Sequence, residues 1–197
     1  MRPVNDPGPT VTLLRHGETE WSRSGRHTGR TDLDLTEVGR RQAGAAAALL
    51  DGPFDLVLCS PLRRARATAE LAGLCAPEID PDLREWDYGE MEGLTTAQIR
   101  EQIPGWSIWD GPWPGGETAD QVSARADRVV DRVRRQAAGS RVVLVAHGHL
   151  LRALAARWIR EPVSFGRCLA LDTASVSVLG SEHGAPALRR WNLVAGG

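Results

Sequence analysis

The chain has 197 residues and a formal charge of −1, from 24 basic and 25 acidic side chains. This length suits one compact α/β domain, and the near-neutral charge argues against a general nucleic-acid binder, which needs a basic surplus. Every basic residue is an arginine, so the sequence excludes both a Walker-A lysine and a Schiff-base lysine mechanism.

The N-terminus and the cysteines point to an intracellular protein. Segment 1–9 is polar and proline-rich, which predicts a flexible lead-in without the apolar core of a signal peptide. No apolar run reaches the roughly 20 residues that a membrane-spanning helix needs. Cys59, Cys75 and Cys168 form no CxxC pair, so a disulfide framework is not indicated. We therefore expect a cytoplasmic protein with no membrane partner.

Apolar runs alternate with amphipathic runs along the chain. In chain order, the pattern predicts a strand over 10–14, a helix capped by Thr36 and running to about Leu50, a strand over 55–60, a helix over 63–74, a short strand over 78–83, helices over 95–102 and 118–137, a strand over 141–146, a helix over 150–159, and closing strands over 174–179 and 186–193. Continuous apolar strands between helices predict a mainly parallel α/β sheet with helices on both faces. We expect a single domain over residues 1–197.

Two of the predicted strands end in the same way. His16-Gly17 follows the first strand, and His147-Gly148-His149 follows the strand over 141–146. Ligands of open α/β sheets bind beyond the carboxyl ends of the strands. If these strands are neighbours, His16 and His147 meet at that edge, and the glycine after each histidine lets a bulky anion approach the backbone.

A third predicted strand ends at SPLRRARAT, residues 60–68. Arg63, Arg64 and Arg66 then lie in the first turns of a helix whose N-terminus itself favours anions. They point in different directions around that helix, so one or two of them at most can face the crevice. With Arg15 beside the first histidine, the pattern predicts a pocket for a dianionic phosphoryl group.

Acid–base chemistry in such a pocket also needs a carboxylate. Glu85, Asp87, Glu90 and Glu92 all lie in the glycine-punctuated segment REWDYGEMEG. A solvated surface charge is the alternative interpretation of each one, and their spacing does not choose among them.

A zinc site is a further alternative, because His147 and His149 are two residues apart. No HxxEH or DxD pattern accompanies them, and the neighbouring arginines would repel a cation. We therefore expect no metal and no other cofactor.

Five motifs resemble the histidine phosphatase superfamily, in the order of that family. They are RHGETEW at 15–21, HTGRTDLDLTEVGRRQA at 27–43, SPLRRARATAE at 60–70, LREWDYGEMEG at 83–93 and HG at 147–148. The resemblance covers the chain from about Thr10 to Val194. It implies a phosphoglycerate-mutase-like three-layer sandwich, with helices on both faces of a mainly parallel sheet. Dimers are common in this fold, so a homodimer is one of the states that the resemblance allows.

The resemblance also implies roles for particular residues. His16 matches the nucleophile that becomes phosphohistidine, and Glu85 matches the acid–base carboxylate. Arg15, Arg64 and His147 match the groups around the phosphoryl oxygens. The substrate contacts that we expect are Gly17, Ser22, Thr28, Gly29, Gly148 and His149.

The family holds phosphatases and bisphosphoglycerate-dependent mutases, and this sequence departs from the mutase pattern. Ser22 stands where mutases have asparagine, Thr96 where they have lysine, and His149 where they also have asparagine; the loop over 107–118 lacks their arginine pair. Fewer charged contacts weaken retention of a bisphosphorylated intermediate, which favours hydrolysis. Several segments look similar to sedoheptulose-bisphosphatase-like sugar phosphatases and to actinobacterial acid phosphatases.

We therefore predict a phosphatase that acts on small phosphorylated metabolites, with the mutase as the alternative. A non-catalytic phosphoester-binding protein is the third hypothesis. Such proteins usually lose the nucleophile or the carboxylate, and this chain retains His16, Glu85 and His147.

Overall fold

The computed structural model describes residues 8–196 and contains one six-stranded sheet in the order β3-β2-β4-β1-β5-β6. The strands are β1 (Thr10–Arg15), β2 (Leu56–Cys59), β3 (Glu78–Ile79), β4 (Arg141–Ala146), β5 (Val176–Glu182) and β6 (Ala185–Leu193). The pairs β3-β2, β2-β4 and β4-β1 are parallel, whereas β1-β5 and β5-β6 are antiparallel. The prediction of a mainly parallel sheet is confirmed.

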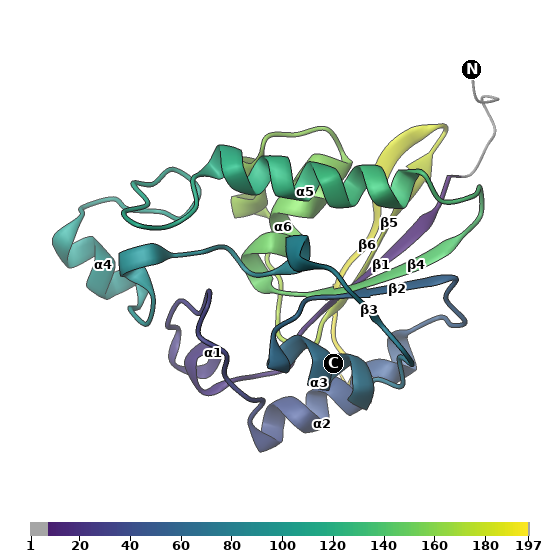
Figure 1. Cartoon of the computed structure of the whole chain (residues 1–197), viewed down its shortest axis with the longest axis horizontal. Helices are drawn as coiled ribbons and strands as arrows, with labels where there is room; N and C mark the ends of the chain where they lie inside the picture. The colour runs from purple at the N-terminus through teal and green to yellow at the C-terminus, as the bar shows by residue number, and fades with distance from the viewer. Residues whose placement is uncertain (1–7, 197) are drawn as a thin grey trace.

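Helices cover both faces of this sheet (Figure 1). One face carries α2 (Glu37–Ala46) and α3 (Arg63–Leu71), and the other carries α5 (Ala119–Arg134) and α6 (Gly148–Trp158). The short helices α1 (Glu20–Ser24) and α4 (Thr96–Gln102) lie beyond one end of the sheet. Short 3-10 helices occupy Ala47–Leu49, Pro81–Leu83, Gly89–Met91 and Val163–Cys168.

The two helix layers explain why the central strands are apolar at successive positions. Leu13 and Leu144 pack into the cluster under α5 and α6, whereas Leu14 and Val145 pack into the cluster under α2 and α3. Successive side chains of a strand point to opposite faces, so a strand covered on both faces is apolar throughout. Cys59 belongs to the second cluster, where burial raises the pKa of its thiol to about 12.

Several helix starts follow the capping signals in the sequence. The Thr36 hydroxyl accepts a hydrogen bond from the N–H of Gly39, and Thr118 with Gln121 forms a capping box at α5. A similar box of Thr19 and Ser22 begins α1, which the sequence analysis did not predict. With five residues, α1 is too short to show an apolar period.

Several predicted boundaries differ from the observed ones by two to four residues, and the largest difference has a local reason. The strand predicted over 78–83 ends at Ile79, because Pro81 cannot donate to a sheet and the Asp80 side chain accepts from the N–H of Asp82 to start a 3-10 turn. Helix α6 begins at Gly148 instead of Leu150, directly after His147. Of the predicted lead-in over 1–9, residues 1–7 lie outside the described residues.

The carboxyl ends of β2, β4 and β1 lie next to one another at the centre of the sheet. Arg15 is paired with Ala146 in the register of β1 and β4, so the residues that follow both strands leave the sheet side by side. In residues 8–196, no helix is long and apolar enough to cross a membrane.

Candidate active site

His16 and His147 meet at this edge of the sheet, as the strand-end pattern predicts. Each histidine directly follows its strand, and the centroids of the two rings lie 5.1 Å apart at an interplanar angle of 58°. Both side chains are buried. The segments after β1 and β4 therefore bring two imidazole rings into one small space.

The hydrogen bond of His16 assigns its tautomer. Its Nδ1 lies 2.7 Å from the carbonyl oxygen of Gly17. Because a carbonyl oxygen can only accept, Nδ1 carries the proton and the lone pair lies on Nε2. Burial holds the pKa of His16 well below its usual 6.5, and the charges of Arg64 and Arg15 lower it further. His16 is therefore a neutral imidazole with a free Nε2 lone pair at pH 7.

His147 is also held in one orientation. Its Nδ1 accepts from Nε of Arg64 at 3.2 Å, so its Nε2 carries the proton and donates to Oγ of Ser60 at 2.7 Å. Burial lowers the pKa of His147 well below its usual value, and the positive charge of Arg64 lowers it further. The sequence analysis did not single out Ser60, although it ends the same predicted strand that precedes Arg64.

Arg64 is the arginine of its helix that turns inward. Its Nη1 donates to the carbonyl of Thr31 at 2.9 Å, and its Nη2 donates to the carbonyls of Thr28 and Gly29 at 3.0 and 3.2 Å. The carboxylate of Glu92 accepts from the backbone N–H groups of residues 29, 30 and 31. Glu92 thus fixes the backbone turn over residues 28–31, and the carbonyl oxygens of this turn bind the Arg64 guanidinium.

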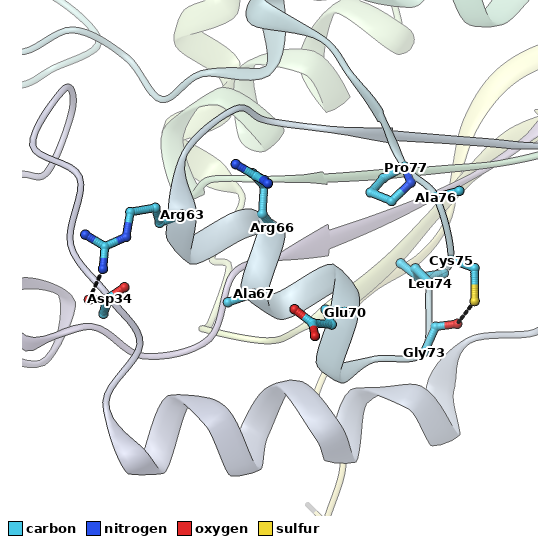
Figure 2. Close-up of a pocket in the computed structure, with 10 residues that line it drawn as sticks. All are labelled: Asp34, Arg63, Arg66, Ala67, Glu70, Gly73, Leu74, Cys75, Ala76 and Pro77. Carbon is cyan, nitrogen blue, oxygen red and sulfur yellow. Dashed lines mark hydrogen bonds and ion pairs between the residues drawn. The ribbon is translucent and has the colours of Figure 1, made fainter.

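Arg63 and Arg66, the other two candidates, lie outside this site. Arg63 is exposed and pairs with Asp34, and Arg66 is exposed one turn further on. Both line a cavity of about 670 Å³ between α3 and the loop that follows it, where Figure 2 shows them with Cys75. None of the predicted site residues lines this cavity.

Arg15 lies against the start of α6. Its Nη1 donates to the carbonyl of Leu171, and burial lowers its pKa. Within residues 8–196, its Nε is a buried side-chain nitrogen without a hydrogen-bond partner. A Cβ built on Gly148 would lie 3.3 Å from the guanidinium carbon of Arg15, so the glycine allows this close approach.

Gly17 is also required by packing. A Cβ at this position would collide with the carbonyl oxygen of Gly39, and the N–H of Gly17 donates to Oγ1 of Thr68 at 3.0 Å. Gly17 therefore makes room for the α2 backbone, and Gly148 makes room for the Arg15 guanidinium. The expectation that these glycines let a bulky anion approach the backbone is replaced by these contacts within the protein.

Glu85 is the carboxylate that binds the start of α6, directly after His147. It is 7% exposed, and its oxygens accept from the backbone N–H groups of Trp86, His149 and Leu150 at 2.9, 3.0 and 2.9 Å. Two of these donors belong to the first turn of α6, which begins directly after His147. Three backbone donors thus fix the carboxyl group beside His147.

The other three carboxylates of this segment have different environments. Glu90 is exposed, as the surface-charge interpretation requires. That interpretation is wrong for Asp87, which is buried and pairs with Arg30 at 2.6 Å, and for Glu92, which binds the turn described above. Neither contact could be derived from the spacing of the carboxylates.

His149, whose backbone N–H binds Glu85, has its ring among other aromatic rings. Its Nδ1 shares a hydrogen bond of 2.6 Å with the hydroxyl of Tyr88, and its ring also contacts those of His27 and Trp109. Burial lowers the pKa of His149 well below its usual value and that of His27 to about 4. Burial raises the pKa of Tyr88 well above 10. The sequence analysis missed Tyr88 and His27, although both lie inside the quoted motifs.

Ser22, and the histidines His147 and His149 that are two positions apart, each have partners within the protein. The Ser22 hydroxyl accepts from the N–H of Thr19 and donates to its carbonyl, so it is used in the cap of α1. His147 and His149 contact different partners, Ser60 and Tyr88. The described residues contain no group of three or more His, Cys, Asp or Glu side chains that could hold a metal ion.

Comparison with known proteins matches this geometry to a family. The model of the histidine phosphatase superfamily, branch 1, matches residues 11–194. The chain belongs to this superfamily. An acid phosphatase of Mycobacterium tuberculosis is 48% identical over 178 residues, which cover 88% of this chain and 87% of the relative. The sedoheptulose 1,7-bisphosphatase of Saccharomyces cerevisiae is 34% identical over 183 residues, which cover 76% and 67%.

A solved structure of an open reading frame product from Mycobacterium tuberculosis superposes with a TM-score of 0.91 and is 46% identical, covering 94% of this chain and 98% of the other. The phosphoglycerate-mutase-like fold of this histidine phosphatase is confirmed. Both relatives named above are phosphatases, which favours the phosphatase over the mutase, as predicted. The chain is a phosphoric monoester hydrolase.

Proposed function

We propose that this histidine phosphatase hydrolyses small phosphate monoesters through a phosphohistidine on His16. In the first step, Nε2 of His16 attacks phosphorus in line with the leaving oxygen. The N–P bond forms while the P–O bond breaks, and the electron pair goes to the leaving oxygen. The carboxyl group of Glu85 donates its proton to that oxygen, so the product leaves as a neutral alcohol.

In the second step, water attacks the phosphorus of the phosphohistidine. The carboxylate of Glu85 takes the proton of the water, the N–P bond breaks, and inorganic phosphate leaves. His16 regains its lone pair and Glu85 its proton, so both groups return to their starting states.

Arg15, Arg64 and His147 surround the phosphoryl oxygens, and the two guanidinium groups stabilise the negative charge on these oxygens during both steps. The buried Nε of Arg15 supports this role. A buried donor without a partner costs about 1–3 kcal/mol, and a phosphoryl oxygen is an acceptor that would remove this cost. The observation that carries the proposal is the tautomer of His16, because the Gly17 carbonyl leaves Nε2 as the nucleophile.

The substrate is a small phosphorylated metabolite, and its leaving group lies among residues around the histidine pair. Thr28 and Gly29 belong to the turn that binds Arg64, and His149 lies next to Glu85. Gly17, Gly148 and Ser22 complete the proposed set through the backbone that they shape: the glycines give room to Gly39 and to Arg15, and the Ser22 hydroxyl caps α1. A single domain, a homodimer and a cytoplasmic location stay predictions from the sequence.

Trapping the intermediate tests this proposal. Wild-type protein is mixed rapidly with p-nitrophenyl phosphate and quenched in alkali, in which phosphohistidine is stable, and the labelled peptide is identified by mass spectrometry. We expect the phosphoryl group on His16, with no label and no phosphate release from His16→Ala. His183→Ala is the matched control, because the His183 side chain is 93% exposed. Phosphate release by His16→Ala at the wild-type rate would contradict the proposal.

A further inference from the structure

Arg125 of α5 and Glu117 of the loop before it form an ion pair, which contacts the backbone around Glu85. Arg125 is buried in the first half of α5. Its Nη1 donates to the carbonyl oxygens of Asp82 and Arg84, each at 2.7 Å. Its Nη2 lies 3.4 Å from the carbonyl oxygen of Glu85 itself. One guanidinium thus binds three backbone carbonyls that lead up to and include Glu85.

Glu117 binds both the guanidinium and the backbone on the other side of Glu85. Its carboxylate accepts from Nε and Nη2 of Arg125 at 3.0 and 2.7 Å, which is a bidentate pair. The same carboxylate accepts from the N–H of Asp87 at 3.0 Å. The Glu117 carbonyl accepts from the indole N–H of Trp86 at 2.8 Å. The pair therefore binds the chain before and after the proposed catalytic carboxylate.

The segment over 82–87 is not packed against other side chains where it faces Arg125 and Glu117. A cavity of about 570 Å³ lies against it, and Glu85, Arg125 and Glu117 are among the residues that line it. Trp86 is fully buried and packs against Trp109 and Trp113, so the core fixes this side chain. Where side chains do not fill the space, hydrogen bonds to the backbone must set its position.

We propose that Arg125 and Glu117 are positioning residues for Glu85. This inference rests on the proposed function, in which Glu85 transfers the proton of the leaving group. The ion pair, called here the Arg125–Glu117 clamp, holds the backbone of 82–87 so that the Glu85 carboxyl group reaches the leaving oxygen. A misplacement of about 1 Å in such a group can cost about 100-fold in rate.

The clamp predicts a kinetic effect that depends on the leaving group. Glu117→Gln keeps the shape but removes the charge, and Arg125→Lys keeps the charge but removes the planar fork. For each variant we expect hydrolysis of an alkyl phosphate to fall about 10- to 100-fold. Phosphorylation of His16 by p-nitrophenyl phosphate, whose leaving group needs no proton, falls less than about 3-fold, measured as the pre-steady-state burst. Inhibition by inorganic phosphate stays unchanged, because the clamp does not touch the oxygen-binding groups.

Two further variants separate positioning from stability. Removing one partner of this partly buried pair leaves an unpaired charge and lowers the melting temperature, so Arg125→Met with Glu117→Gln removes both charges together. The matched control is Arg128→Met, one turn along α5. Arg128 is exposed and bonds to the carboxylate of Asp82 at 2.8 and 2.6 Å, so it contacts the same segment without touching its carbonyls. We expect the double variant to behave as the single ones and the control to behave as wild type.

The outcomes distinguish this inference from the proposed function. Equal losses on both substrates, a loss matched by Arg128→Met, or full alkyl phosphate hydrolysis by the folded clamp variants would each overturn the positioning role and leave the proposed function intact. A wild-type protein that forms no phosphohistidine with either substrate would overturn the proposed function and the positioning role with it.

Discussion

Glu85 differs from its neighbouring carboxylates in what its oxygens contact. They accept from three backbone N–H groups, two of them in the first turn of α6, which begins directly after His147. Asp87 pairs with Arg30, and Glu90 faces solvent. A carboxyl group that transfers a proton must lie within hydrogen-bond reach of the reacting oxygen. Among these three, Glu85 is the one bound at the start of α6, next to His147, which favours it for this role.

Glu85→Gln should therefore slow the hydrolysis of substrates with poor leaving groups. An alkyl phosphate leaves as a strongly basic alkoxide and needs a proton in the transition state, and such help contributes about 100- to 10,000-fold. We expect alkyl phosphate hydrolysis to fall by at least about 100-fold. The burst of His16 phosphorylation by p-nitrophenyl phosphate should fall much less, because p-nitrophenolate leaves without a proton. Burst and steady-state rates are measured for both substrates.

Glu90→Gln is the control for this prediction, because it makes the same chemical change on an exposed side chain of the same segment. We expect wild-type rates from it. If Glu90→Gln abolished alkyl phosphate hydrolysis while Glu85→Gln retained it, the acid–base residue would be wrongly assigned.

The elements that carry the site were largely predictable from the sequence, whereas the choice of residues within them was not. The strand over 141–146 and the capping box at Thr118 are local signals, and the structure has both. Which of three arginines turns inward depends on contacts with the turn over 28–31, more than 30 positions away in the chain. The residues alone left that choice open, and the family resemblance chose Arg64.

Contacts between elements account for the residues that were missed. The sequence left Glu92 and Asp87 open to interpretation as surface charges, because their partners lie about 60 positions earlier in the chain. Glu92 binds the turn over 29–31, and Asp87 pairs with Arg30. Arg125 lies on a regular amphipathic helix, where a charge normally faces solvent. Hydrophobic periodicity and capping signals are local, so they do not predict which charged side chain binds the backbone of a distant segment.

The turn over 28–31 provides a prediction at this scale. Glu92→Gln replaces a charged acceptor of three backbone N–H groups with a neutral one, and charge-assisted hydrogen bonds are roughly twice as strong. The turn should then hold Arg64 less firmly, so we expect the inhibition constant of inorganic phosphate and the KM of substrates to rise about 10-fold. The ratio of alkyl to p-nitrophenyl phosphate rates should not change, because Glu85 is untouched. A change in that ratio with unchanged phosphate inhibition would contradict this account of the turn.

At the scale of the whole molecule, arginine supplies all the basic side chains, and the guanidinium stays charged at every working pH. Arg15 and Arg64 therefore provide permanent positive charge around the proposed phosphoryl site. We expect turnover to survive exhaustive treatment with EDTA and dialysis, measured as phosphate release before and after addition of zinc or magnesium. Loss of activity that either ion restores would support catalysis by a metal ion.

Burial of the histidines should also make the fold sensitive to acid. His16, His27, His147 and His149 all have a lowered pKa in the folded state, and for His27 the value is about 4. As the pH falls below 6.5, the unfolded chain takes up protons at these rings, whereas the folded chain does not until the pH approaches the lowered values. The unfolded state binds more protons in this range, so the free energy of unfolding falls as the pH falls from 6.5 toward 4.

For His27 this linkage amounts to about 2 kcal/mol between pH 7 and pH 5. Urea unfolding of the wild type should therefore show a clear loss of stability over this interval, and His27→Gln should show a loss that is smaller by about 2 kcal/mol. The quantity compared is the difference in the free energy of unfolding between the two pH values, so any constant cost of losing the hydrogen bond between His27 and Thr96 cancels. His183→Gln, at an exposed position, should keep the wild-type difference. If His27→Gln lost as much stability between pH 7 and pH 5 as the wild type, His27 would not be held neutral by burial.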